Sequence, residues 1–272
     1  MAGKIFASYG FLTSRVRREV ISRQLHKVSS NRKLLFPLKM SAAIGNCCHA
    51  SGALETGNGP TRGSFIVFEG LDKSGKSSQA RLLVDRLNDS GISSALLKFP
   101  TREGPVGALI DKYLRKEINL TDESIHLLFS SDRWETQSKI LDLLLEGVTV
   151  IVDRYAYSGI AFSSAKGLDF RWCMQSDAGL LAPDRVLFLN VSTNVALERQ
   201  GFGEERYEKT DFQSIVYEQY QRLMDSEKKL GNEWTIINAD KSKEEVQEDI
   251  HREVLAVIQG PTKTGTFRKL FI

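Results

Sequence analysis

The stretch from Gly70 to Ser78, with the sequence Gly-Leu-Asp-Lys-Ser-Gly-Lys-Ser-Ser, has the residue types and spacing of a phosphate-binding loop. Two glycines separated by four residues let backbone amides turn toward one anion, and Lys76 supplies a mobile positive charge. The hydroxyl of Ser77 is suited to ligate Mg2+. An ordinary glycine turn is the alternative, but the context of strand, loop and helix favours a phosphate site. The residues expected to contact nucleotide phosphates are Gly70, Leu71, Asp72, Lys73, Ser74, Gly75, Lys76, Ser77 and Ser78.

Charged residues follow two more apolar runs that read as buried strands. Asp153 and Arg154 follow residues 148–152, and Arg102 comes shortly after Phe99. A carboxylate at a strand end can hold Mg2+ directly or through water, and an arginine can fork onto phosphate oxygens. The alternative for Asp153 and Arg154 is a strand-end ion pair. Together with the phosphate loop, the pattern favours phosphoryl transfer.

Phe129 and Arg133 are four residues apart in an expected helix and therefore share one face. An aromatic ring beside a planar cation could stack on a nucleobase and hydrogen-bond it. The alternative is that Phe129 is a core residue, and spacing alone favours that interpretation.

Residues 200–209, with the sequence QGFGEERYEK, are charged and contain glycine hinges between two expected helices. Such a segment could close over a phosphate chain, exclude water and bring in Arg199 or Arg206. The alternative is a solvated loop between helices.

These residues need a framework, and from Ser64 onward the chain alternates apolar strands with helices. The expected strands cover residues 65–68, 94–99, 148–152, 186–191 and 234–237. Helix starts are indicated at Thr121 and by capping-box patterns at Thr210 and Ser242. The alternation predicts an α/β fold of the P-loop NTPase type, with a mainly parallel five-stranded sheet flanked by helices. Ligands in such folds lie beyond the carboxyl ends of the strands.

The charge of the chain is unevenly distributed. Residues 1–60 hold nine Lys and Arg against two acids, whereas the remainder holds 28 basic and 32 acidic residues. Residues 1–45 have the Arg- and Ser-rich composition of an organelle transit peptide, and 46–63 read as a flexible linker. We therefore expect a mitochondrial or other organelle location, and a second start at Met40 would give a cytosolic or nuclear form. A basic tail that touches nucleic acid is the alternative.

The remaining composition excludes several classes of protein. The three cysteines, of which Cys47 and Cys48 are adjacent, form no disulfide framework. The body from residue 61 has no basic excess, so no nucleic-acid footprint is expected there. No apolar run is long enough to cross a bilayer, so no membrane contact is expected.

Several segments, taken in order, resemble the thymidylate kinase family. They are FIVFEGLDKSGKSSQ, LLKFPTREGPVG, HLLFSSDRWE, VIVDRYAYSGIAFSSAKG, APDRVLFLNV and GFGEERYE, which together span about 64–258. The resemblance implies a nucleoside monophosphate kinase domain over 64–259, a short lid at about 199–210 and a C-terminal tail over 260–272. It also implies ATP-dependent phosphorylation of thymidine 5'-monophosphate (dTMP) to the diphosphate for dTTP synthesis, with Mg2+ as cofactor. ATP and dTMP would be the small-molecule partners, and the chain would form a homodimer.

The resemblance also assigns roles to residues. Asp72 would hold the 3'-hydroxyl of the deoxyribose, Arg102 and Arg154 the phosphate of dTMP, and Phe129 and Arg133 the thymine. The implied substrate-binding set is Asp72, Phe99, Arg102, Phe129, Arg133, Arg154, Ser158, Gly159, Phe162 and Tyr207. The implied catalytic set is Lys73, Lys76, Arg154 and Arg206, with Arg199 at ATP and with Ser77 and Asp153 as metal ligands.

Two positions depart from the family pattern. Lys73 stands where eukaryotic members usually have an arginine, and lysine cannot make the planar two-pronged contact. Whether Lys73 acts alone or shares the role with Arg206 or Arg199 stays open. The common Phe-Pro-Glu-Arg motif has Thr101 in place of its acid, so no role of that acid carries over.

Two rival interpretations are less consistent with the sequence. The whole series of motifs disfavours a kinase for another nucleoside monophosphate. A GTP-operated switch needs a separate Asp-x-x-Gly and an Asn-Lys-x-Asp. The chain has neither, since its Asp-x-x-Gly at 72–75 lies inside the phosphate loop.

Overall fold

The computed structural model describes residues 62–192, 195, 206–207, 210–232, 234–260 and 267–272 of the 272-residue chain. The expected leader over 1–45 and most of the linker over 46–63 lie outside these residues. The same holds for most of the lid, including Arg199. The predictions made for those segments therefore stay predictions.

Five strands form one sheet in the order β2-β3-β1-β4-β5, and every pair is parallel. The strands are β1 Phe65–Glu69, β2 Ser94–Lys98, β3 Thr149–Asp153, β4 Arg185–Asn190 and β5 Thr235–Asn238. Each agrees with its expected range to within one residue at either end. The predicted five-stranded parallel sheet is confirmed.

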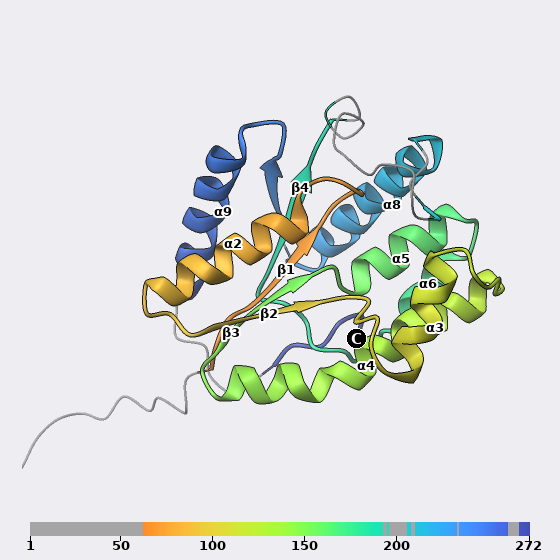
Figure 1. The fold of residues 1–272 in the computed structure, drawn as a ribbon, viewed down its shortest axis with the longest axis horizontal. Coiled ribbons are helices and arrows are strands. Elements are labelled where there is room, and N and C mark those ends of the chain that lie inside the picture. The colour runs from red at the N-terminus through yellow and green to blue at the C-terminus, as the bar shows by residue number, and fades with distance from the viewer. Residues whose placement is uncertain (1–61, 193–194, 196–205, 208–209, 233, 261–266) are drawn as a thin grey trace, which may run out of the picture. The chain divides into compact units, whose positions relative to one another are not determined.

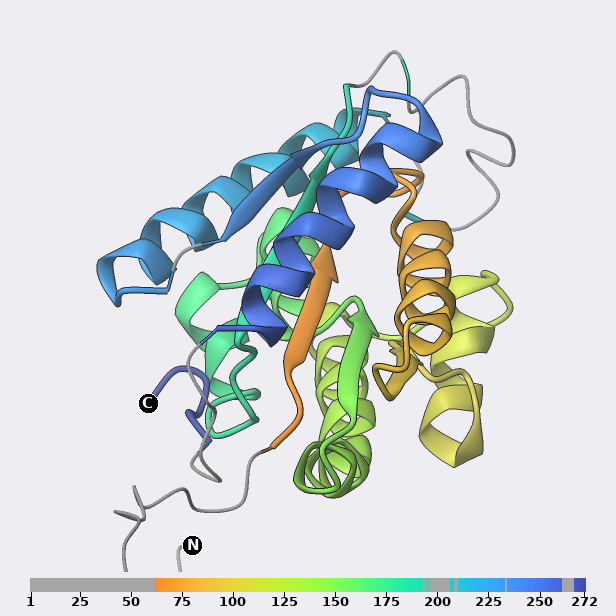
Figure 2. The same ribbon diagram turned by 90° about the vertical axis from the view of Figure 1, so that its left-hand side faces the viewer.

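Helices cover both faces of this sheet, as a parallel sheet requires. They are α2 Lys76–Asp89, α3 Gly104–Leu114, α4 Asp122–Leu145, α5 Ala156–Ala165, α6 Phe170–Gln175, α8 Thr210–Lys229 and α9 Lys243–Ile258. Figure 1 shows α2 and α9 on one side and α5 and α8 on the other, and in Figure 2 the α2 and α9 side is turned toward the viewer. No helix within the described residues combines the length and apolar content needed to span a bilayer.

The core is divided in two by the alternation of side chains along the strands. Phe65 and Val67 of β1 join the cluster formed with α4, α5 and α8, whereas Ile66 and Phe68 join the cluster beneath α2 and α9. All four are at most 1% exposed. Burial on both faces explains why this strand is an unbroken apolar run, and it fixes where the following loop begins.

Two of the predicted helix starts are confirmed in detail. Thr121 caps α4 by accepting a hydrogen bond from the amide of Ser124 at 3.3 Å. Ser242 and Glu245 form the reciprocal capping box of α9. These local contacts can be predicted because both partners lie within one helical turn.

The third pattern predicts the correct helix start. The helix α8 begins at Thr210, as expected. Gln213, which the capping-box pattern assigned to the helix end, places its side-chain amide against Asp72 and the carbonyl of Tyr207. The side chain of Thr210 lies outside what the structure describes, so the capping box at this helix stays a prediction.

The last described residues, 267–272, pack against the segment that precedes β4. Lys269 forms an antiparallel bridge with Leu181, and the amide of Leu270 donates to the carbonyl of Leu180 at 2.8 Å. The side chain of Leu270 is only 2% exposed. This end of the chain therefore contributes to the core.

Candidate active site

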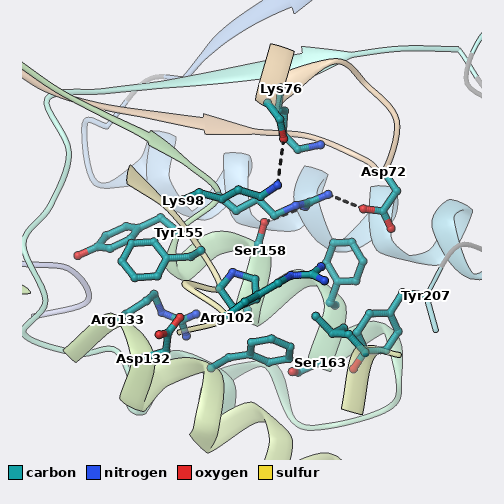
Figure 3. A pocket seen from close by; sticks show the side chains of 18 of the residues that line it. Asp72, Lys76, Lys98, Arg102, Asp132, Arg133, Tyr155, Ser158, Ser163 and Tyr207 are labelled. Atoms are coloured by element: carbon teal, nitrogen blue, oxygen red, sulfur yellow. Dashed lines mark hydrogen bonds and ion pairs between the residues drawn. The ribbon is translucent and has the colours of Figure 1, made fainter. Parts of the chain in front are cut away.

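The carboxyl ends of β1, β2 and β3 open onto a cavity of about 440 Å³ (Figure 3). The strand ends are adjacent because Asp153 pairs in register with Phe68 on one side and Lys98 on the other. Six basic side chains and two acidic ones line the cavity, namely Lys73, Lys76, Lys98, Arg102, Arg133 and Arg154 against Asp72 and Asp132. A cleft with this excess of positive charge suits an anionic ligand.

The phosphate loop connects β1 to α2. Gly70 has φ of 142°, and a Cβ there would lie 2.6 Å from the carbonyl oxygen of Leu189. Gly75 has φ of 95° and directly precedes Lys76, the first residue of α2. Only glycine fits these two positions, and the resulting turn directs the N-terminus of α2 toward the cavity.

Lys76 is buried in this loop, with a side chain 4% exposed. Its ammonium donates to the carbonyl of Leu71 and, at 3.0 Å, to the hydroxyl of Ser74. Burial, followed by the charge of Arg154, lowers the pKa of Lys76 to about 7, although nearby carboxylates act in the opposite direction. Phosphate oxygens bound in the loop would place negative charge next to Lys76 and favour its protonated form.

Arg154 lies at the centre of a set of contacts between the loop and α5. Its guanidinium donates to Asp72, to the hydroxyl of Ser158 at 3.1 Å and to the carbonyl of Gly70 at 3.3 Å. It also lies 5.3 Å from the ring centroid of Phe162. Burial alone would lower the pKa of Arg154, but Asp72 and other negative neighbours raise it above its usual value. Arg154 therefore stays charged and is held in place.

Glu69, the last residue of β1, was missed by the sequence analysis. It is fully buried and accepts hydrogen bonds from the amides of Tyr155 and Ser158 and from the hydroxyls of Ser158 and Tyr220, at 2.6–3.1 Å. Burial raises the pKa of this carboxyl above its usual value. Its contacts fix the start of α5 next to Arg154. Its place at the carboxyl end of a buried strand was the available signal.

Ser77 and Asp153, the expected metal ligands, are in direct contact. The hydroxyl of Ser77 donates to one carboxylate oxygen of Asp153, and the other carboxylate oxygen is buried without a hydrogen-bond partner. Mg2+ prefers such oxygens and takes its remaining ligands from phosphates and water, so the pair fits this ion. Within the described residues, no group of three or more His, Cys, Asp or Glu is arranged to hold a metal.

Lys98 is another residue that the sequence analysis missed. Its ammonium lies 3.4 Å from the hydroxyl of Ser77 and 3.9 Å from Asp153. It ends β2, so the rule that ligands lie at the carboxyl ends of strands could have identified it. Lys98 adds a cation beside the expected metal ligands.

Phe129 and Arg133 both line the cavity, and Figure 3 shows Arg133 at the end away from Lys76. Phe129 also packs against the core cluster around Ile110, so the two interpretations of this residue are compatible. Arg133 is 3% exposed and forks onto Asp177, with nitrogen–oxygen distances of 3.1 and 2.7 Å. A Cβ on Gly159 would lie 2.8 Å from a terminal nitrogen of Arg133, so a larger residue there would require the guanidinium to shift.

Of the expected lid residues, Tyr207 lines the cavity and Arg206 does not. The ring of Tyr207 stacks on Phe212 at 5.6 Å and lies 5.6 Å from Phe162, and burial raises its pKa. The guanidinium of Arg206 instead lies 4.2 Å from the ring of Tyr113 and donates to that residue's carbonyl. A catalytic role for Arg206 therefore stays a prediction.

The cavity brings together most of the residues that the sequence singled out. Those that line it are Asp72, Lys73, Gly75, Lys76, Ser77, Ser78, Phe99, Arg102, Phe129, Arg133, Arg154, Ser158, Gly159, Phe162 and Tyr207. Gly70, Leu71 and Ser74 form the loop behind this surface, and Asp153 contacts Ser77. The sequence had no signal for Asp177, because it lies 44 residues from its partner Arg133.

Comparisons with known proteins identify the family of this chain. The family model described as Thymidylate kinase matches residues 68–250. A curated thymidylate kinase of Arabidopsis thaliana is 44% identical over 249 residues, covering 90% of this chain and 92% of the relative. The human thymidylate kinase is 45% identical over 190 residues, covering 70% and 88%. A solved structure of thymidylate kinase from Candida albicans matches with a TM-score of 0.70 and 34% identity, over 77% of this chain and 99% of that one. The chain therefore belongs to the thymidylate kinase family.

Proposed function

We propose that this protein transfers the γ-phosphoryl group of ATP to dTMP, giving thymidine diphosphate and ADP. The observation that carries the proposal is a single cavity that joins the phosphate loop to the pair Phe129 and Arg133. A kinase for a nucleoside monophosphate needs both ends, because the acceptor phosphate must lie next to the donor's phosphates. Relatives named thymidylate kinase match most of this chain, which supports the choice of acceptor.

The donor half of the cavity binds the phosphates of ATP. The amides at the start of α2 and the ammonium of Lys76 face the phosphate chain. Mg2+, held through Ser77 and Asp153, would neutralise charge on the phosphate oxygens. Asp153→Asn should raise the Mg2+ concentration needed for half-maximal turnover, and an unchanged requirement would count against this assignment.

The acceptor half binds dTMP by its base, sugar and phosphate. Phe129 would stack on the thymine, and Arg133, fixed by Asp177, would donate a hydrogen bond to it. Arg102 and Arg154 would bind the acceptor phosphate. The Asp72 carboxylate pairs with Arg154, so the residues expected at the sugar and at the phosphate of dTMP are in direct contact.

Phosphoryl transfer in this site needs little acid-base chemistry. The acceptor phosphate oxygen is already ionised at neutral pH, so positioning and charge neutralisation account for the catalysis. Lys76, Lys73 and Arg154 would stabilise the charge that spreads over the transferring group. Lys73 lies in the wall of the cavity, whereas Arg206 binds backbone carbonyls outside it, so we assign the greater share to Lys73.

A coupled assay of ADP release tests the reaction and its acceptor. Purified protein is supplied with ATP, Mg2+ and, in turn, the monophosphates of thymidine, uridine, cytidine, guanosine and adenosine. We expect turnover to be fastest with dTMP, and preference for another monophosphate would refute the proposed acceptor. Lys76→Ala should lose most turnover, whereas Lys139→Ala, on the exposed side of α4, should keep it.

We also infer a homodimer formed through α4. Leu127, Trp134 and Leu145 lie along one side of this helix and are 49%, 41% and 52% exposed. Light scattering on the eluted protein should give about twice the chain mass of 30.5 kDa. Leu127→Glu should give the single-chain mass, and a wild-type monomer would refute the inference.

We further propose that residues 1–45 direct the protein to an organelle, with mitochondria as the first candidate. The composition of the leader supports this proposal. The alignment with the Arabidopsis relative covers 90% of this chain, so it includes part of residues 1–61. A fluorescent fusion of residues 1–60 should enter an organelle, whereas a fusion beginning at Met40 should not. Diffuse cytosolic fluorescence from the longer fusion would refute the proposal.

A further inference from the structure

The turn between β2 and α3 carries Arg102, which is expected to bind the acceptor phosphate. Arg102 has φ of 58°, a left-handed conformation that residues other than glycine adopt only when their surroundings impose it. Gly107 of α3 approaches the turn so closely that a Cβ there would lie 2.9 Å from the carbonyl carbon of Arg102. One side of the turn is therefore held by α3.

The other side is held by Asp132 of α4. One carboxylate oxygen of Asp132 accepts from the amide of Thr101 at 2.9 Å, and the other accepts from the hydroxyl of Thr101 at 2.6 Å. Asp132 is 2% exposed and lines the cavity (Figure 3). Both oxygens of a buried carboxylate are thus directed at the one residue that precedes Arg102.

From this geometry we propose that Asp132 is a positioning residue for the acceptor phosphate: it holds Thr101 so that Arg102 keeps its orientation in the cavity. The proposal rests on the proposed function, since it assigns to Asp132 a part in acceptor binding. It predicts that replacing Asp132 raises KM for the acceptor nucleotide much more than KM for ATP.

The contacts distinguish this role from two others. Asp132 is not the ion-pair partner of its neighbour Arg133, because that guanidinium forks onto Asp177. Asp132 also is not among the expected metal ligands, since Ser77 pairs with Asp153. Within the described part of the chain, the Asp132 carboxylate accepts its hydrogen bonds from Thr101.

The pairing also accounts for the missing acid of the Phe-Pro-Thr-Arg segment. The common family motif has glutamate where this chain has Thr101. Here the Asp132 carboxylate reaches the same turn from α4, while the Arg102 guanidinium itself pairs with Asp111 of α3 at 2.9 Å. Placing glutamate at 101 beside an intact Asp132 would put two carboxylates together in a buried site, which is strongly unfavourable.

The first experiment measures KM for dTMP and for ATP separately in the ADP-release assay. For Asp132→Ala we expect KM for dTMP to rise about tenfold or more, with KM for ATP changed by less than about twofold. Asp132→Asn can still accept from the Thr101 amide and donate to its hydroxyl, so it should recover most of the loss. Glu135→Ala, which removes an exposed acid of the same helix, is the matched control and should not alter either KM.

The second experiment exchanges the acid between the two positions. Thr101→Glu alone should raise KM for dTMP more than Asp132→Ala does. The double variant Thr101→Glu with Asp132→Asn should return it to within about threefold of the wild type. Circular dichroism and a thermal melt on each variant identify any that fail to fold, and the exchange remains informative because the double variant restores a single charge.

The outcomes separate this proposal from the proposed function. If the wild type prefers another monophosphate, the function is wrong, and the same comparison of KM values is made with that acceptor. The inference is overturned if Asp132→Ala raises both KM values equally, or if it lowers kcat without changing KM for the acceptor. It is also overturned if the double variant is as impaired as Thr101→Glu alone.

Discussion

Replacing the loop lysine by an apolar residue, Lys76→Met, should abolish turnover and yet stabilise the ligand-free protein. Burial lowers the pKa of Lys76 from 10.5 to about 7, so folding at pH 7 works against its protonation. With one pKa unit worth about 1.4 kcal/mol, this costs about 4 kcal/mol at pH 7. Losing the lysine leaves its acceptors on Leu71 and Ser74 without that donor, at about 1–3 kcal/mol. The net gain should be about 1–3 kcal/mol.

Urea unfolding followed by tryptophan fluorescence measures this difference without nucleotide. The folded-state pKa lies below the unfolded value, so the unfolded chain binds more protons between pH 7 and 10.5. The wild type should therefore gain stability relative to Lys76→Met as the pH rises through that window. Lys139→Met, at an exposed position of α4, is the control and should show no such trend. The reasoning fails if Lys76→Met is no more stable at pH 7, or if the difference does not shrink with rising pH.

Three further changes test other parts of the site. Gly159→Ala places a Cβ 2.8 Å from Arg133, so KM for dTMP should rise about tenfold while KM for ATP holds, as steady-state kinetics would show. Asp177→Ala leaves Arg133 buried without its partner and should lower the free energy of unfolding by about 3–5 kcal/mol, measured in urea. Lys73→Ala should lower kcat at least about tenfold and Lys73→Arg should recover it, whereas equal single-turnover rates in all three proteins would remove Lys73 from the chemistry.

The sequence predicted the strand-end residues well, because one rule places them. Parallel strands end at the same edge of a sheet, so Asp153 after β3 and the loop after β1 had to meet once the strands were recognised. Strand recognition was reliable here because β1 and β3 are apolar on both faces. The same rule covers Lys98 and Glu69, which lie inside segments that resemble the family but were assigned no role of their own.

Contacts across the fold could not be predicted in the same way. Asp132 meets Thr101 across 31 residues, and Asp177 meets Arg133 across 44. The spacing of these pairs in the sequence follows no helix or strand period. Each contact depends on how closely α4 packs against its neighbours. Gln213 likewise meets Asp72 across 141 residues, a contact that no local pattern predicts.

The orientation of the cationic side chains in the cavity depends on their backbone conformation as well as on their residue type. Lys73, Arg102 and Arg154 all have left-handed backbone conformations, with φ of 59°, 58° and 68°. Each such residue costs about 1–2 kcal/mol compared with a right-handed one, and glycine would avoid that cost. Glycine would also remove the charged side chain. These three positions therefore keep a strained backbone conformation, which directs a cation into the cavity. Arg154 is held by Asp72, and the Arg102 guanidinium pairs with Asp111 at 2.9 Å. The protein's own contacts thus hold the positive charge in place, which is the preorganisation that phosphoryl transfer requires.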